Sequence, residues 1–276
     1  MLPNYLVIGA AKCGTTSLCH ALGLHPDIFM TDPKEVHFFG RTDPVRTLEW
    51  YHSVLQPAAG RKAVGEGSTS YTHPDIIDVC AEHIARVVPR CRLIYIVRDP
   101  IDRLESDWRM RRHDGWAPAT INEAVARQPN LVRHGLYWRN LSVYRRCFTD
   151  EQILVLFLED FARDPQAQLR RCFSHLGVDP DVTIEGTHRP RNAARDYRKD
   201  GRVARRLRAA TSFSTLKARM PSWLVRLAKA GLTTKISYAL DWDPGLKASV
   251  ASEFADDSPR FLRYCGKHPD FWQVQP

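Results

Sequence analysis

Short strand-like segments separated by helical patterns constrain the fold of this chain more than any other feature. Two of these segments, Arg92–Val97 and 152–158, are nearly continuous apolar runs instead of alternating ones. Such runs are typical of parallel strands that are buried on both faces of a sheet. Two further strands are predicted at 5–9 and 62–66, and helices at about 15–24, 74–88, 101–113, 137–148 and 160–176. The alternation predicts an α/β fold of the P-loop type, in which a central parallel β-sheet carries helices on both faces.

The length and charge of the chain narrow its function class. Its 276 residues are enough for a hydrophobic core without disulfide or metal support. We expect a single domain over 1–276, with a basic helical flap and C-terminal helices at about 189–276, among them amphipathic helices at 221–230 and about 244–265. Lys and Arg number 40 against 31 Asp and Glu, so the formal net charge is +9. Such a surplus favours an anionic partner: nucleic acid, a membrane surface or a phosphorylated small molecule.

The apolar runs, the N-terminus and the cysteines of the chain indicate where in the cell the protein is expected. No run approaches the ~20 apolar residues of a membrane-spanning helix, and the N-terminus lacks the charged start of a signal peptide. The seven cysteines form no C-x-x-C pair, which disfavours both a zinc site and a disulfide framework. We therefore expect a cytoplasmic protein with free thiols, no bound metal and no integral membrane association.

The first predicted strand runs directly into a glycine-containing loop. Gly9 and Gly14 have the spacing of the phosphate loop G-x-x-x-x-G-K-[ST]. The residue after Gly14 is Thr15, where that pattern has lysine. The loop instead contains a lysine at an earlier position, Lys12. The start of the following helix presents N–H groups to an anion. We therefore predict a phosphate site formed by Lys12, Cys13, Gly14, Thr15, Thr16 and Ser17.

The run 12–18, K-C-G-T-T-S-L, resembles the 5′-phosphosulfate loop of sulfotransferases that use 3′-phosphoadenylyl sulfate (PAPS), in the form found in the heparan-sulfate-type branch and its small bacterial relatives. The segment 34–39, K-E-V-H-F-F, resembles the K-E-x-H-F-F segment of that branch, and 98–106 resembles its 3′-phosphate motif. The resemblance spans most of the chain and is weakest between about 186 and 245.

The resemblance implies sulfuryl transfer from PAPS, as co-substrate and without a metal, to a hydroxyl or amine of a small-molecule, glycan or lipid-linked acceptor. It implies that Lys12 stabilises charge beside the phosphosulfate and that Glu35 is the base, with His37 orienting it or assisting proton transfer. We expect Val36, Phe38 and Phe39 to shield Glu35 from water.

The 3′-phosphate is assigned to Arg98 and Ser106. Arg98 directly follows a strand, at the edge where open α/β sheets bind ligands, and its guanidinium matches phosphate oxygens. The alternative for Arg98 is a surface ion pair with Asp99 or Asp102. Ser106 lies about two helical turns into the next helix, and Arg103 is interpreted as structural.

The sequence departs from the resembled pattern at several positions. Gly40 replaces an aspartate found in some members, for which Asp43 is a substitute, and Gly67 replaces a lysine. A flap over the nucleotide is predicted from the basic run 189–219, with Arg191 as a binding residue; Arg189 and the segment 199–202 are further candidates, and a solvated helix face is the alternative. Four aromatic residues are candidates for an acceptor cleft or for simple packing: Trp108, Trp116, Tyr137 and Trp138.

Two other function classes compete with this hypothesis. A P-loop kinase or nucleotide hydrolase is disfavoured because Thr15 occupies the position of the phosphate-reaching lysine. A nucleic-acid-binding module would use the run 189–219, but no base-stacking or groove-reading motif accompanies it, and we expect no nucleic-acid partner. The sequence leaves the acceptor and the oligomeric state open.

Overall fold

The computed structural model describes residues 1–40, 46–186, 198–200, 233–235 and 238–272. The chain divides into two compact units, one formed by Met1–Arg191 and Asp241–Pro276 and the other by Asn192–Leu240. In the second unit, β6 (Arg198–Asp200) pairs antiparallel with β7 (Thr233–Lys235). The predicted site residue Arg191, its neighbour Arg189 and the helix expected at 221–230 lie outside the described residues. The prediction of one domain over the whole chain stays a prediction.

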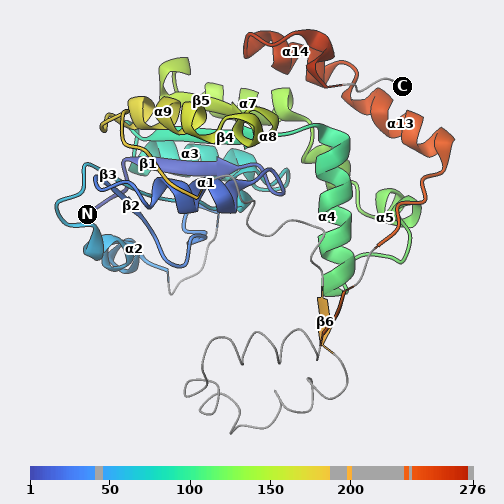
Figure 1. Ribbon diagram of the computed structural model, residues 1–276, viewed down its shortest axis with the longest axis horizontal. Helices are drawn as coiled ribbons and strands as arrows, with labels where there is room; N and C mark the ends of the chain where they lie inside the picture. Colours follow the sequence, from blue (N-terminus) through green and yellow to red (C-terminus); the bar gives the residue numbers. More distant parts are fainter. Residues whose placement is uncertain (41–45, 187–197, 201–232, 236–237, 273–276) are drawn as a thin grey trace, which may run out of the picture. The chain divides into compact units, whose positions relative to one another are not determined.

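A five-stranded parallel sheet forms the centre of the first unit (Figure 1). Its strand order is β2-β3-β1-β4-β5, and its strands are β1 (Tyr5–Gly9), β2 (Ile28–Met30), β3 (Ala63–Glu66), β4 (Arg92–Val97) and β5 (Ile153–Phe157). The four predicted strands are confirmed to within one residue at each end. The edge strand β2 was not predicted, because three residues are too few to show a periodic pattern.

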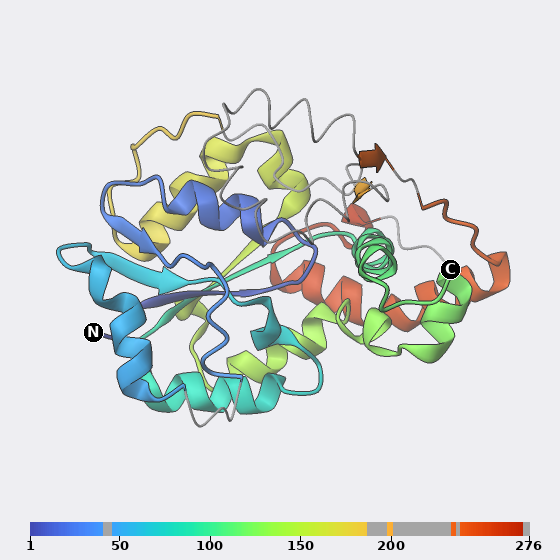
Figure 2. The same ribbon diagram turned by 90° about the horizontal axis from the view of Figure 1, so that it is seen from below.

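Helices cover both faces of the sheet, as predicted (Figure 2). On one face, Tyr5 and Val7 of β1 pack with α1 (Thr15–Leu22), α8 (Leu158–Arg163) and α9 (Pro165–Leu176). On the other face, Leu6 and Ile8 pack with α2 (Leu48–Leu55), α3 (Ile77–Val87) and α7 (Tyr137–Arg145). All four side chains are fully buried, which explains why the central strands read as unbroken apolar runs.

Capping residues set the helix boundaries. Asp99 accepts a hydrogen bond from the Asp102 N–H and begins α4 (Pro100–Asp114), whose first residue is proline. Asp164 caps α9 in the same way through the Ala167 N–H, and this cap divides the helix expected at 160–176 into α8 and α9. Two short helices between α4 and α7 were not predicted: α5 (Ile121–Arg127) and α6 (Asn130–Arg133).

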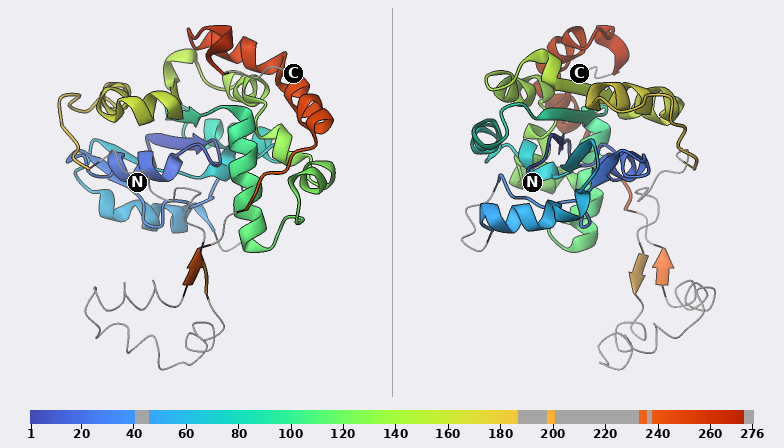
Figure 3. Two further views of the ribbon diagram at one scale, coloured as in Figure 1. Left: turned by 45° about the vertical axis from the view of Figure 1, so that its right-hand side comes forward. Right: turned by 90° about the vertical axis from the view of Figure 1, so that its left-hand side faces the viewer.

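The C-terminal region forms two helices where one was expected over 244–265. They are α13 (Pro244–Phe254) and α14 (Asp257–Tyr264), and α14 packs against α7 (Figure 3). The largely buried carboxylate of Asp257 accepts hydrogen bonds of 2.9 Å from the N–H groups of Trp138 and Arg139. The first turn of α7 has no intrahelical acceptors for these N–H groups, so Asp257 joins the start of α14 to the start of α7. Within the described part of the chain, each helix is too short or too polar to cross a membrane.

Candidate active site

The predicted site residues gather at the carboxyl edge of the sheet. The phosphate loop follows β1, the segment 31–37 follows β2, the segment 67–72 follows β3, and Arg98 follows β4. These four strands are neighbours, and ligands of open α/β sheets bind at this edge. The helix α4 begins here, directly after β4, and runs away from the sheet (Figure 1).

The phosphate loop ends at Gly14, the N-cap of α1. Gly14 has φ +85°, and a side chain there would place Cβ 2.6 Å from Cδ1 of Leu158, so conformation and packing both require glycine. The N-cap has no side chain that could accept a hydrogen bond from the N–H groups of the first turn, which have no intrahelical acceptors. These groups and the helix dipole are suited to an anion, and the phosphate site expected in this loop stays a prediction. Of the three hydroxyl residues that follow, Thr15 is buried, Thr16 is exposed and Ser17 is intermediate.

Lys12 lies within this loop with a left-handed backbone (φ +69°). Its ammonium donates to the sulfur of Met110 on α4 at 3.2 Å, and a thioether is a weak acceptor. No carboxylate of the described residues forms an ion pair with it, and burial lowers the pKa of Lys12 below its ordinary value. A largely buried cation with so weak a partner is suited to an anionic ligand.

Cys13 contributes its backbone to the loop, and its thiol faces the core. Its Sγ lies 3.6 Å from the hydroxyl of Tyr137, and burial raises the pKa of Cys13 to about 11, so the thiol is neutral. The ring of Tyr137 packs in turn on Phe261 of α14 and on Trp272, each with ring centres 5.5 Å apart. The phosphate loop is thus supported from behind by aromatic residues of the C-terminal region.

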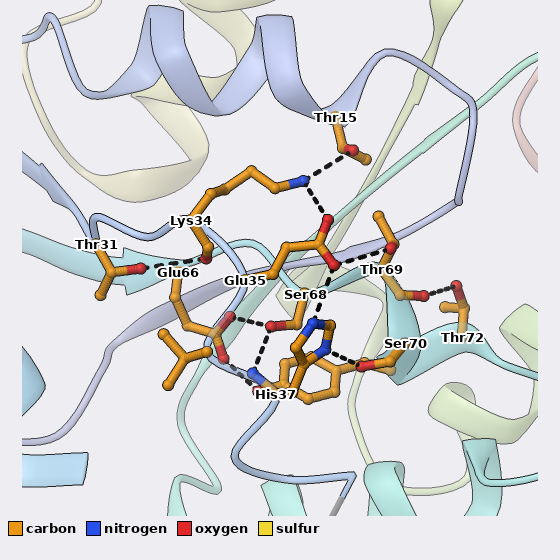
Figure 4. A network of polar contacts seen from close by, with 12 residues as sticks. Thr15, Thr31, Lys34, Glu35, His37, Glu66, Ser68, Thr69, Ser70 and Thr72 are labelled. Carbon is orange, nitrogen blue, oxygen red and sulfur yellow. Dashed lines mark hydrogen bonds and ion pairs between the residues drawn. The ribbon is translucent and has the colours of Figure 1, made fainter. Parts of the chain in front are cut away.

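Glu35, the predicted base, makes three polar contacts (Figure 4). Its Oε1 lies 2.9 Å from Nζ of Lys34, and its Oε2 accepts a hydrogen bond from the Thr69 hydroxyl at 3.2 Å and lies 3.3 Å from Nε2 of His37. The expectation that flanking apolar residues shield it from water is wrong: its side chain is 33% exposed. Phe38 and Phe39 are directed into the core instead, where Phe38 stacks on Tyr51.

His37 lies beside Glu35 with a left-handed backbone (φ +56°). Its Nδ1 is 2.6 Å from the hydroxyl of Ser70, and its backbone N–H donates to the hydroxyl of Ser68 at 2.8 Å. Ser70 therefore occupies the position of a third member of the Glu35–His37 group. From the sequence, Asp43 was the expected substitute for the aspartate that Gly40 replaces; Asp43 lies outside the described residues.

A fully buried carboxyl group, that of Glu66 at the end of β3, lies beside this group of residues (Figure 4). It accepts hydrogen bonds from the hydroxyls of Ser68 (2.6 Å) and Tyr71 and from the backbone N–H of Val36. Burial raises the pKa of Glu66 from 4.5 to about 7, although its hydrogen bonds act in the opposite direction. This role was not predicted from the sequence; the signal was an acidic residue at the end of a buried strand.

The segment 66–70 supports the segment 34–37 along its whole length. Besides the contacts of Glu66, Ser68, Thr69 and Ser70, the N–H of Gly67 donates to the carbonyl of Lys34 at 3.1 Å. A side chain at Gly67 would place Cβ 2.5 Å from the sulfur of Cys19, so this position has no space for the lysine of the resembled pattern.

The predicted 3′-phosphate residues lie at the start of α4. Arg98 is 22% exposed and pairs with Asp102 at 2.6 Å, which is the alternative partner that the sequence suggested. Ser106 is nearly buried two turns further along α4. Arg103 is fully buried, with Asp107 at 3.1 Å and the carbonyl of Leu131 as partners, so its structural interpretation is confirmed.

The four aromatic candidates for an acceptor cleft separate into different environments. Trp108 and Tyr137 are core residues, and Trp138 packs against the ring of Tyr264. Trp116 is 70% exposed. Packing therefore accounts for three of the four. The described residues also contain no group of three or more His, Cys, Asp or Glu side chains that could hold a metal ion.

Comparison with known proteins decides the class of this site. The family model of the sulfotransferase domain matches residues 2–238. The chain belongs to the sulfotransferase family. Sulfotransferases of this family use PAPS, and the match favours them over the P-loop kinases that the loop also suggested. A sulfotransferase from Alicyclobacillus acidocaldarius has the same fold, with a TM-score of 0.71 and 23% identity over 99% of both chains.

Two mouse relatives extend the comparison. The chain is 27% identical over 206 residues to bifunctional heparan sulfate N-deacetylase/N-sulfotransferase 3, and the match covers 65% of this chain and 23% of the relative. It is 28% identical over 191 residues to heparan sulfate glucosamine 3-O-sulfotransferase 3B1, covering 66% and 48%. The chain therefore spans less than half the length of either relative.

Proposed function

We propose that this chain transfers the sulfuryl group of PAPS to a hydroxyl or amine of an acceptor, as a cytoplasmic enzyme. One observation supports this above all: Nζ of Lys34 contacts both the Thr15 hydroxyl, at the start of α1, and the Glu35 carboxylate. The side chain of a single residue, Lys34, therefore spans the distance between the candidate base and the phosphate loop. An acceptor held at Glu35 would face a phosphosulfate held at that loop.

The proposed step is an in-line displacement at sulfur. The acceptor oxygen or nitrogen forms a bond to sulfur while the bond from sulfur to the 5′-phosphate oxygen breaks. The acceptor proton passes to Oε1 or Oε2 of Glu35, and 3′-phosphoadenosine 5′-phosphate (PAP) leaves with the electron pair of the broken bond. Lys12 stabilises the charge that develops on the bridging oxygen, and His37 orients Glu35.

Binding of the nucleotide is assigned to both ends of the site. The loop residues Lys12 to Ser17 hold the 5′-phosphosulfate, while Arg98 and Ser106 hold the 3′-phosphate. Arg191 and the basic run 189–219 are proposed to cover the nucleotide. The acceptor class stays a small molecule, a glycan or a lipid-linked group, and the missing side chain at Gly67 argues against the highly sulfated polysaccharide type.

Thermal unfolding in the presence of PAP, of ATP with magnesium, or of a DNA duplex tests the nucleotide. Stabilisation by PAP supports the proposal, and stabilisation by ATP with magnesium but not by PAP would reject it. A screen of hydroxyl and amine acceptors with labelled PAPS then tests transfer.

Substitutions at the two central residues test the chemistry. Lys12→Ala and Glu35→Gln are expected to abolish transfer, since loss of one transition-state donor costs on the order of 10²–10³ in rate. Glu35→Gln should leave PAP affinity nearly unchanged. Lys62→Ala and Glu49→Gln, at exposed positions, are matched controls that should retain activity.

A further inference from the structure

Lys34 connects the two halves of the site. Its ammonium donates to Oγ1 of Thr15 at 3.2 Å and lies 2.9 Å from Oε1 of Glu35 (Figure 4). Thr15 is the first residue of α1, whereas Glu35 is the candidate base, so the ammonium spans the gap between phosphate loop and base.

The position of this ammonium is fixed by the rest of the residue. The carbonyl of Lys34 accepts hydrogen bonds from the Gly67 N–H (3.1 Å) and from the hydroxyl of Thr31 (3.2 Å). Its side chain is 18% exposed, and Cγ lies 3.4 Å from the Cβ position that a side chain at Gly67 would occupy. A lysine side chain is usually mobile, but here the backbone is anchored by two hydrogen bonds and the stem is largely buried beside Gly67.

An ammonium has three donors, and the described residues supply acceptors for two of them. The third is available to a ligand oxygen. A sulfuryl group in transit between a 5′-phosphate at α1 and an acceptor at Glu35 must pass beside this ammonium, and its three equatorial oxygens carry the spread negative charge.

We propose that Lys34 is a catalytic residue that binds the non-bridging oxygens of the transferring sulfuryl group, while Lys12 serves the bridging oxygen. This inference rests on the proposed function. When the sulfonate is bound, Lys34 shares its charge between sulfonate and Glu35, and the base becomes free to accept the acceptor proton. The step adds no atoms to the displacement: Lys34 donates hydrogen bonds and transfers no proton.

The difference between PAPS and PAP tests this role without an acceptor, because PAP lacks only the sulfonate. Lys34→Met keeps the apolar stem and removes the charge. Titration calorimetry should show PAPS binding weakened about tenfold or more, the loss expected for a charge-assisted hydrogen bond, and PAP binding changed less than about twofold. Lys34→Arg, which retains the charge, should recover part of the PAPS affinity.

Lys62→Met is the matched control, since Nζ of Lys62 pairs with Asp27 at the same 2.9 Å on the surface. It should leave both affinities unchanged. Glu35→Gln breaks the ion pair but keeps the ammonium, and should retain the preference for PAPS. If Lys34→Met weakens PAPS and PAP equally, or neither, Lys34 only pairs with Glu35 and the inference is wrong. If the wild-type protein binds neither nucleotide, the proposed function itself fails.

Discussion

The hydroxyl of Ser70 lies 2.6 Å from Nδ1 of His37. The other ring nitrogen, Nε2, faces the Glu35 carboxylate at 3.3 Å. An ionised carboxylate only accepts hydrogen bonds, so Nε2 carries the proton in the neutral imidazole, and Nδ1 accepts from the Ser70 hydroxyl. The hydrogen-bonded series Glu35–His37–Ser70 therefore contains a single carboxylate and holds His37 in the tautomer that carries its proton on Nε2.

Ser70→Ala removes this fixing hydrogen bond. We expect the transfer rate to fall about five- to tenfold, because one neutral hydrogen bond is worth about 1 kcal/mol, while PAP affinity stays unchanged. Ser70→Thr retains the hydroxyl and should retain most of the rate. Steady-state kinetics with an acceptor found in the screen measures both. A wild-type transfer rate in Ser70→Ala would show that His37 is oriented without the Ser70 hydroxyl.

Glu66 makes the stability of the protein depend on pH. Because its pKa is higher in the folded state (about 7) than its ordinary value of 4.5, the folded protein binds the proton more tightly. The stabilisation is complete below about pH 4.5 and is lost as the pH rises through about 7. Glu66→Gln cannot titrate, so the wild type should lose about 2 kcal/mol relative to this variant between pH 5 and pH 8.

Urea unfolding of both proteins at several pH values measures this difference. Glu253→Gln, at an exposed position of α13, is the control and should follow the wild type. Parallel stability curves for Glu66→Gln and the wild type would contradict the raised pKa of Glu66.

Arg98→Ala tests the assignment of the 3′-phosphate. We expect PAP to bind roughly ten- to a hundredfold more weakly, since the guanidinium makes charge-assisted hydrogen bonds to phosphate. Adenosine 5′-phosphosulfate, which lacks the 3′-phosphate, should be affected much less. Asp102→Asn releases Arg98 from its ion pair and should maintain or strengthen PAP binding. Equal weakening of both nucleotides by Arg98→Ala would reject the assignment.

Gly67→Ala should destabilise the fold by about 1–3 kcal/mol, because the added Cβ would lie 2.5 Å from the sulfur of Cys19. The double variant Cys19→Ala/Gly67→Ala removes the obstructing sulfur and should regain most of that loss in thermal unfolding. If adding Cys19→Ala to the Gly67→Ala variant does not restore stability, the clash with the Cys19 sulfur is not the cause of the destabilisation.

The sequence was sufficient to predict four of the five strands and the helical layers on both faces, because these depend on local patterns. Residues such as Val7 and Ile8 are buried on opposite faces, which leaves a continuous apolar run. The phosphate loop was also predictable, since Gly14 and Lys12 lie within one short segment. Residues assembled from separate segments were not: Ser70 meets His37 from 33 positions away.

Burial of a polar group was the other feature that the sequence did not reveal. Glu66 is the last residue of β3 and Glu35 lies in the segment that follows β2, yet Glu66 is fully buried and Glu35 is one-third exposed. The difference depends on how Tyr71, Ser68 and Val36 surround Glu66 in space. The apolar neighbours of Glu35 suggested that it would be shielded from water. This expectation failed because their side chains turn to the core.

The contact of Tyr137 with Cys13 makes the nucleotide loop dependent on the far end of the chain. Phe261 and Trp272 form the wall behind Tyr137, so shortening the protein before α14 would remove the backing of a loop more than 240 positions earlier. A truncated version that still folds should bind PAP more weakly than the full chain.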